Sequence, residues 1–336
     1  MHRYFYACLM AVAMVASPLA FAEPQRVRIG VGGQASIYHL PLAIAVNRGY
    51  FQAQQLEVEV IDFAGGGKAM QALLTDAVDV LSGAFEHSIR AQARGMATQA
   101  FVLVSESPQI AMAVSLNALP DYRSLTDLRG KKIGISAPGS STQMVASLVL
   151  GQAGIAAQEV SFIGLGTGVA ALEALRTGKV DALVNSEPLM AHLEARDAVR
   201  IVADTRTPAG TAQLFGGPVA SNVLLARNRY IDANPQTVQR LTNAMLNTLD
   251  WLRQATPDEI TAAVPESWLM NNAPLYQKAF SNLQPSLSAD GRFTHQAVTN
   301  LLQALHGFDQ TLGKRDLDPH VTWTNRFVDN ADRSAP

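Results

Sequence analysis

The chain has 336 residues, of which 48% are hydrophobic and 16% are charged, and its formal net charge at pH 7 is −2. This composition excludes an intrinsically disordered chain and is sufficient for two domains with cores of their own. The nearly balanced charge gives no basic field for nucleic acid, and no cluster of Lys and Arg indicates a patch for a membrane surface.

Residues 1–22 have the pattern of an export signal. Arg3 supplies a positive charge, and an apolar stretch follows from Tyr4 to Ala16. After Ser17-Pro18, the run Ala20-Phe21-Ala22 fits a small-x-small cleavage site. The alternative is an uncleaved membrane anchor, for which the apolar stretch is short. We therefore expect cleavage after Ala22 and a periplasmic mature protein.

The only cysteine, Cys8, lies inside this expected signal peptide. The mature chain would therefore have no disulfide, no thiol nucleophile and no cysteine metal ligand. Seven histidines are scattered along the chain, and neither a Gly-x-Ser-x-Gly elbow nor a His-Glu-x-x-His motif is present. We accordingly predict no catalytic residues, no metal and no cofactor.

Short strands and helices alternate in the first part of the mature chain. Helices of about ten residues between strands predict parallel pairing, because a parallel connection must cross over the sheet. The predicted strands are 26–31, 56–61, 78–81 and 99–104, and the predicted helices are 41–47, 68–75 and a segment that runs from the loop 82–87 to Gly95.

The same pattern then occurs a second time. Residues 72–82 (ALLTDAVDVLS) and 174–184 (ALRTGKVDALV) are identical at six of eleven positions. Two similar α/β lobes in one exported chain predict a cleft between them that captures a ligand. The second lobe is predicted to contain strands ending at 135 and at 159–163, 180–184 and 199–202, with helices at 141–151, 168–176 and 189–195.

After residue 218 the chain becomes mostly helical. A strand at 219–226 precedes a long amphipathic helix at 235–254, and helical segments follow near 273–282 and 294–305. Because this tail has no sheet of its own to cover, we expect it to pack on the first lobe. The predicted domains are 23–110 with 219–336 for lobe 1 and 111–218 for lobe 2. Strands near 108–115 and 217–224 are expected to connect them as a hinge.

The ligand is expected beyond the carboxyl ends of the strands, where helix N-termini converge. Two of the loops there, 65–67 and 139–142, leave backbone N–H groups unobstructed for an anion, or simply form tight turns and N-caps. Glu86 and Glu187 occupy matching places in the two lobes, where they bind a ligand ammonium or serve as acids at helix starts. The cleft-facing loops are predicted at 32–39, 63–67, 82–87, 136–142, 165–168 and 185–188.

Aromatic and polar residues in these loops complete the predicted site. Tyr38, Phe63 and Phe85 are candidates for an apolar wall, with the core as their alternative place. The predicted ligand-binding residues are Gln34, Tyr38, His39, Gly65, Gly66, Gly67, Phe85, Glu86, Gly139, Ser140, Ser141, Thr142, Asn185 and Glu187.

Several motifs resemble those of type-2 periplasmic substrate-binding proteins. The run 127–134 (DLRGKKIG) resembles a family signature, and Glu187-Pro188 and Asn234-Pro235 are similar to family features. Together with 41–51 (PLAIAVNRGYF) and 63–73 (FAGGGKAMQAL), they resemble the nitrate, sulfonate and taurine group, which includes thiamine-precursor binders. The resemblance implies two α/β lobes, each a mostly parallel sheet flanked by helices, with a two-strand hinge and the ligand in the cleft.

The same resemblance implies a monomeric receptor that delivers its ligand to an ABC permease in the inner membrane. The preferred ligand is a small organic anion of the sulfonate or taurine kind. The alternatives are a neutral or aromatic heterocycle, such as a thiamine precursor, and a role as the sensing partner of a membrane kinase. Pyrimidine-precursor synthases similar to this family carry a cysteine-rich iron motif, which the mature chain lacks, so an enzyme is not expected.

Overall fold

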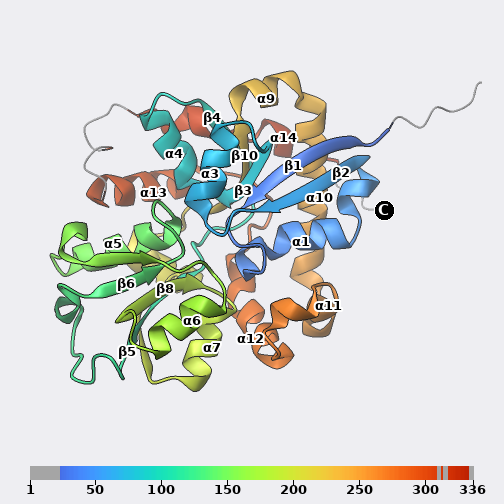
Figure 1. Ribbon diagram of the computed structural model, residues 1–336. Helices are drawn as coiled ribbons and strands as arrows, with labels where there is room; N and C mark the ends of the chain where they lie inside the picture. Colours follow the sequence, from blue (N-terminus) through green and yellow to red (C-terminus); the bar gives the residue numbers. More distant parts are fainter. Residues whose placement is uncertain (1–22, 309–311, 313–316, 333–336) are drawn as a thin grey trace, which may run out of the picture.

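The computed structural model describes residues 23–308, 312 and 317–332, so the expected signal peptide lies outside the described residues. The chain forms two lobes, each built on a five-stranded sheet with helices on its faces (Figure 1). Within the described ranges, no helix is long and apolar enough to cross a membrane.

The two sheets have the same spatial arrangement of strands, although the antiparallel strand comes last along the chain in the first sheet and first in the second. Their strand orders are β2-β1-β3-β10-β4 and β7-β6-β8-β5-β9. In each sheet one strand, β10 or β5, runs antiparallel to both of its neighbours, so the sheets are mixed. The strands are β1 (Gln25–Val31), β2 (Leu56–Asp62), β3 (Val80–Ala84), β4 (Thr98–Leu103), β5 (Ile110–Ser115), β6 (Lys132–Ile135), β7 (Ser161–Gly164), β8 (Ala182–Ser186), β9 (Val199–Asp204) and β10 (Asn222–Arg227).

The predicted helices are present, and shorter ones lie between them. Residues 82–84, predicted as loop, instead belong to β3, where small side chains fit a fully buried central strand. The helices are α1 (Leu40–Asn47), α2 (Tyr50–Ala53), α3 (Gly66–Leu74), α4 (Glu86–Ala93), α5 (Ser141–Gln152), α6 (Val169–Arg176), α7 (Leu189–Arg196), α8 (Pro208–Phe215), α9 (Asn228–Ala233), α10 (Pro235–Gln254), α11 (Pro257–Ala262), α12 (Ala273–Leu283), α13 (His295–Phe308) and α14 (Arg326–Asp329).

Two irregular segments, 104–109 and 216–221, connect the lobes. The strands expected to cross between the lobes do not do so, because β5 and β10 are each paired on both sides within a single sheet. The connecting segments instead bond to one another. The Ser221 N–H donates to the Ser105 carbonyl and the Val219 N–H donates to the Glu106 carbonyl, each at 3.1 Å.

The C-terminal helices cover the first lobe and also reach the second. Helix α10 packs on α1, α2 and β4, as expected for a tail without its own sheet. In addition, α12 contacts α7, and α13 contacts α5 and α8. Leu301 and Leu305 of α13 lie in the same buried cluster as Met144 and Val149 of α5. The tail therefore joins the lobes, rather than covering lobe 1 alone.

An ion cluster centred on the buried pair Arg206 and Glu187 fixes the loop between β8 and α7. One guanidinium nitrogen of Arg206 lies 2.5 Å from a Glu187 carboxylate oxygen and 2.6 Å from Glu194, while the other lies 2.6 Å from Asp204. The second Glu187 oxygen accepts the Ala191 N–H at 2.8 Å. Burial raises the pKa of Glu187, and the Arg206 charge and these hydrogen bonds oppose that rise.

Arg206→Met is expected to lower the free energy of unfolding by about 3–5 kcal/mol, because the Glu187 carboxylate would remain buried without a counter-charge. Urea denaturation followed by circular dichroism measures the change. Arg196→Met, at an exposed position on α7, is the control and should be nearly neutral. Equal stability of the two variants would show that the cluster does not stabilise lobe 2.

Candidate functional site

The lobes meet through direct hydrogen bonds across the cleft. These bonds come from strand ends, the loops that follow them and the helices next to those loops in both lobes. They join the hydroxyls of Ser36 and Ser186 (2.7 Å), the Ile37 N–H and the Glu187 carbonyl (2.9 Å), the Ser141 hydroxyl and a Glu86 carboxylate oxygen (2.6 Å), and the Arg90 guanidinium and the Gly139 carbonyl (3.3 Å).

Glycines in lobe 1 let the backbones of the two lobes approach closely. A Cβ atom on Gly65 would lie 2.6 Å from the Ala137 Cβ, and one on Gly67 would lie 2.7 Å from the Pro138 carbonyl oxygen. Neither distance is sterically possible without movement of the lobes. These two glycines, predicted as ligand contacts, therefore form part of the surface on which lobe 2 closes.

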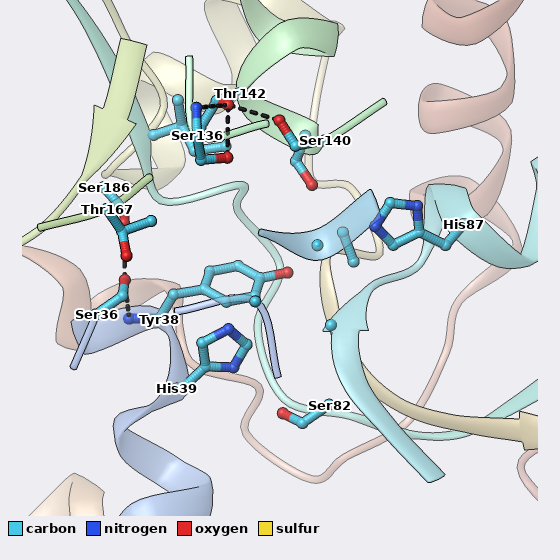
Figure 2. A pocket seen from close by; sticks show the side chains of 16 residues that line it. Ser36, Tyr38, His39, Ser82, His87, Ser136, Ser140, Thr142, Thr167 and Ser186 are labelled. Carbon is cyan, nitrogen blue, oxygen red and sulfur yellow. Dashed lines mark hydrogen bonds between the residues drawn. The ribbon is translucent and has the colours of Figure 1, made fainter. Parts of the chain in front are cut away.

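A small cavity of about 60 Å³ lies between the lobes (Figure 2). Eight of the lining residues are Ser or Thr and two are His, while none is Asp, Glu, Lys or Arg. Tyr38 extends into the space, with His39 beside it and His87 on its far side (Figure 2). The lining residues are Gly32, Ser36, Tyr38, His39, Gly66, Ser82, Gly83, Ala84, His87, Ile110, Ser136, Ser140, Ser141, Thr142, Thr167 and Ser186.

Both histidines of the cavity are neutral at neutral pH. Burial lowers the pKa of His39 to about 4, although the charge of Asp62 opposes the shift. Burial also lowers the pKa of His87, with the Glu86 charge opposing it. The Nδ1 atom of His39 and the Nε2 atom of His87 are buried without a hydrogen-bond partner among the residues described. A neutral imidazole offers one donor and one acceptor, so each ring has a site left for a ligand.

The hydroxyl groups of the 136–142 loop are bonded mainly to one another. The Thr142 hydroxyl oxygen lies 2.9 Å from both the N–H and the hydroxyl of Ser136, and 2.7 Å from the Ser140 hydroxyl. The Ser141 hydroxyl donates to the Glu86 carboxylate, and Glu86 is only 2% exposed. These side chains are therefore less available to an anion than the sequence predicts, and a carboxylate lies beside them.

Six of the predicted binding residues line the cavity: Tyr38, His39, Gly66, Ser140, Ser141 and Thr142. Glu86 lies next to them through its bond with Ser141. The remaining ones are placed elsewhere. Phe85 is buried in the core against Phe293, with the ring centroids 5.5 Å apart, and Glu187 pairs with Arg206. The Asn185 side chain bonds the Gly166 carbonyl, and the backbone N–H of Gln34 donates to Asp62. The glycines outside the lining are Gly65, Gly67 and Gly139.

For three of these residues the structure gives a physical reason for the correction. Phe85 is fully buried in an aromatic cluster, so its ring is unavailable. Each oxygen of the Glu187 carboxylate is engaged, one by Arg206 and the other by the Ala191 N–H, and the Asn185 amide bonds the Gly166 carbonyl and the Ser186 N–H.

Several lining residues were not predicted individually. Nine of these ten residues lie inside loops that the sequence places at the cleft, and five of the ten are serines or threonines. Their small hydroxyl side chains carry no distinctive signal, and only the position after a strand could have selected them. The described chain contains no group of three His, Cys, Asp or Glu side chains able to hold a metal ion.

Residues 36–260 match the profile of the family described as NMT1/THI5 like. A solved structure from Bordetella bronchiseptica RB50 is 42% identical, with a TM-score of 0.88, and the match covers 92% of this chain and 97% of that one. The alkanesulfonate-binding protein SsuA from Xanthomonas axonopodis pv. citri, bound to MOPS, is 19% identical, with a TM-score of 0.69, over 90% of this chain and 99% of its own. The 4-amino-5-hydroxymethyl-2-methylpyrimidine phosphate synthase of Aspergillus parasiticus is 23% identical over 308 residues, 88% of this chain and 84% of that protein.

Stability is expected to decrease as the pH falls through the range between the unfolded and folded pKa values of His39. An unfolded histidine has a pKa near 6.5, against about 4 for His39 in the fold. Because the unfolded chain takes up the proton first, acid favours unfolding, and His39 alone contributes a loss of about 2 kcal/mol between pH 7 and pH 4.5. Above pH 7, His39 is neutral in both the folded and the unfolded state, so it causes no further change in stability.

Urea denaturation at the two pH values tests this, with His39→Gln as the variant and the exposed His306→Gln as its control. His39→Gln should show a smaller acid destabilisation than the wild type, and His306→Gln should not. An unchanged pH dependence in His39→Gln would contradict a neutral buried imidazole.

Proposed function

Because the chain belongs to the NMT1/THI5-like family and has the two-lobed fold of periplasmic binding proteins, we propose that it is the solute-binding component of an ABC importer. The cavity of about 60 Å³ is far smaller than the roughly 300–1,000 Å³ of most ligand sites. A ligand therefore requires the lobes to separate, and their closure around it would form the surface that the permease recognises. The cavity at the lobe interface supports capture by closure.

The ligand proposed is a small heteroaromatic molecule that is neutral or carries an amino group. The observation that carries this proposal is the charge of the site. The cavity has neutral His39 and His87, many hydroxyls and no Lys or Arg, and the buried Glu86 carboxylate lies beside Ser141. An amino group would bond a carboxylate favourably, whereas a bare anion would meet a like charge with no Lys or Arg in the cavity lining to offset it.

An aminopyrimidine meets these requirements. It has a flat ring that Tyr38 and His39 can contact, ring nitrogens that bond imidazole N–H groups, and an exocyclic amine for an acceptor. The name of the Aspergillus relative refers to such a pyrimidine. We propose binding rather than synthesis, because the only cysteine of the sequence is Cys8.

A small organic anion is the second candidate. Helix α5 begins at the cavity with Ser141 and Thr142, and the positive end of its dipole favours a negative group there. The alkanesulfonate binding of the SsuA neighbour is compatible with this candidate. The two candidates require opposite contributions from Glu86.

Glu86→Gln is expected to weaken binding of 4-amino-5-hydroxymethyl-2-methylpyrimidine at least about tenfold, or about 1.4 kcal/mol. Glutamine keeps an oxygen that accepts from Ser141, so the lobe contact is preserved and only the charge is lost. Titration calorimetry of the wild type and the variant measures the effect. The exposed Glu266→Gln is the matched control and should bind like the wild type.

Taurine and nitrate, titrated in parallel, distinguish the second candidate. If an anion binds and Glu86→Gln tightens its binding, the heteroaromatic proposal is wrong and the α5 N-terminus is the more important feature. If neither class binds a folded sample, both ligand assignments fail.

A further inference from the structure

A groove of about 430 Å³ lies on the other side of His87 from the cavity, between α3 and α4. The residues of one wall recur every three or four positions along α3, and those of the other wall recur in the same way along α4 and its C-terminal cap. The groove is lined by Gly67, Met70, Gln71, Leu74, His87, Arg90, Ala91, Arg94, Met96, Pro138 and Gly139.

The two walls differ in chemistry. Met70, Leu74 and Met96 supply apolar surface, and no acidic residue lines the groove. Arg90 and Arg94 supply two guanidinium groups on the α4 side. Arg94 is exposed and has no ion-pair partner among the described residues. Apolar surface beside the Arg94 cation fits a molecule with an apolar body and one negative group.

His87 forms the wall between the groove and the cavity. Its side chain lines both spaces, and the residue is 4% exposed. The Nε2 atom, which has no partner in the described chain, would lie 3.1 Å from a Cβ on Gly66, a residue that lines the cavity and not the groove. The two spaces therefore share a wall, while this hydrogen-bonding atom lies on the cavity side.

The groove is complete only when the lobes are closed. Its walls belong to lobe 1, but its end is formed by Pro138 and Gly139 of lobe 2. Gly67 packs against the Pro138 carbonyl, and Arg90 donates to the Gly139 carbonyl at 3.3 Å. A molecule in the groove would touch both lobes and would therefore favour the closed form.

We propose that the α3–α4 groove is a second binding site, for an amphipathic organic anion such as an arylalkyl carboxylate. The carboxylate pairs with Arg94, the apolar body lies on Met70 and Leu74, and the site is separate from the cavity and from the ligand proposed for it. Because both sites favour closure, occupancy of either one strengthens binding at the other.

Titration calorimetry with 4-phenylbutyrate tests the site, and the uncharged 4-phenylbutanol is the control probe. The wild type should bind the acid more tightly than the alcohol. Arg94→Gln should weaken the acid about fivefold, as expected for one exposed charge pair, and leave the alcohol unchanged. Lys278→Gln removes an exposed cation from α12 and should bind both probes like the wild type.

Two further variants locate the probe. Gln71 is exposed on α3, so Gln71→Trp should fold and fill the groove, abolishing phenylbutyrate binding. Glu86 does not line the groove, so Glu86→Gln should retain phenylbutyrate binding, which separates this test from that of the proposed function. The proposal is overturned if phenylbutyrate does not bind, or if it binds and neither Arg94→Gln nor Gln71→Trp weakens it.

Discussion

Gly65 and Gly67 bring the backbone of lobe 1 into contact with Ala137 and Pro138 of lobe 2. The rest of the interface depends on this close approach. It brings Ser141 within hydrogen-bond distance of Glu86, reduces the cavity to about 60 Å³ and completes the end of the α3–α4 groove. Side chains on these two glycines would hold the lobes apart, and the same loops would then enclose a wider and more open space.

Charged side chains lie around the cavity, while the cavity lining itself is uncharged. Arg206 pairs with the buried Glu187 and with the more exposed Glu194 and Asp204 one loop away from the cavity, where their charges compensate one another. The cavity itself contains hydroxyls and imidazoles that remain neutral. Between the two regions, Glu187 contributes its carboxylate to the network and its backbone carbonyl to the Ile37 contact across the cleft. The ion network thus positions the loop that closes on lobe 1 without placing a charge in the cavity.

The sequence predicts the architecture better than it predicts the side chains of the site. The repeat at 72–82 and 174–184 falls at equivalent places, from the end of α3 into β3 and from the end of α6 into β8, so two similar lobes follow from it. The cleft loops follow from the rule that ligands bind beyond strand ends. The ion pair of Glu187 could not be predicted from the sequence, because Arg206 lies beyond β9 in the chain and only the folded sheet brings the two side chains together. Likewise, no local pattern indicates that Phe85 packs on Phe293, more than 200 residues away in the chain.

The position of β10 has a consequence for the order in which the lobes form. The second sheet is built from one continuous stretch, β5 to β9, and can be completed as soon as that stretch is available. The first sheet cannot be completed at that stage, because its strand β10 lies between β3 and β4 but follows the whole of lobe 2 in the chain. Until it arrives, β3 and β4 each have an unpaired edge, and closing the sheet requires contacts across more than 100 residues, which are slow to form. Lobe 2 is therefore the unit able to fold early, and lobe 1 is assembled around it last.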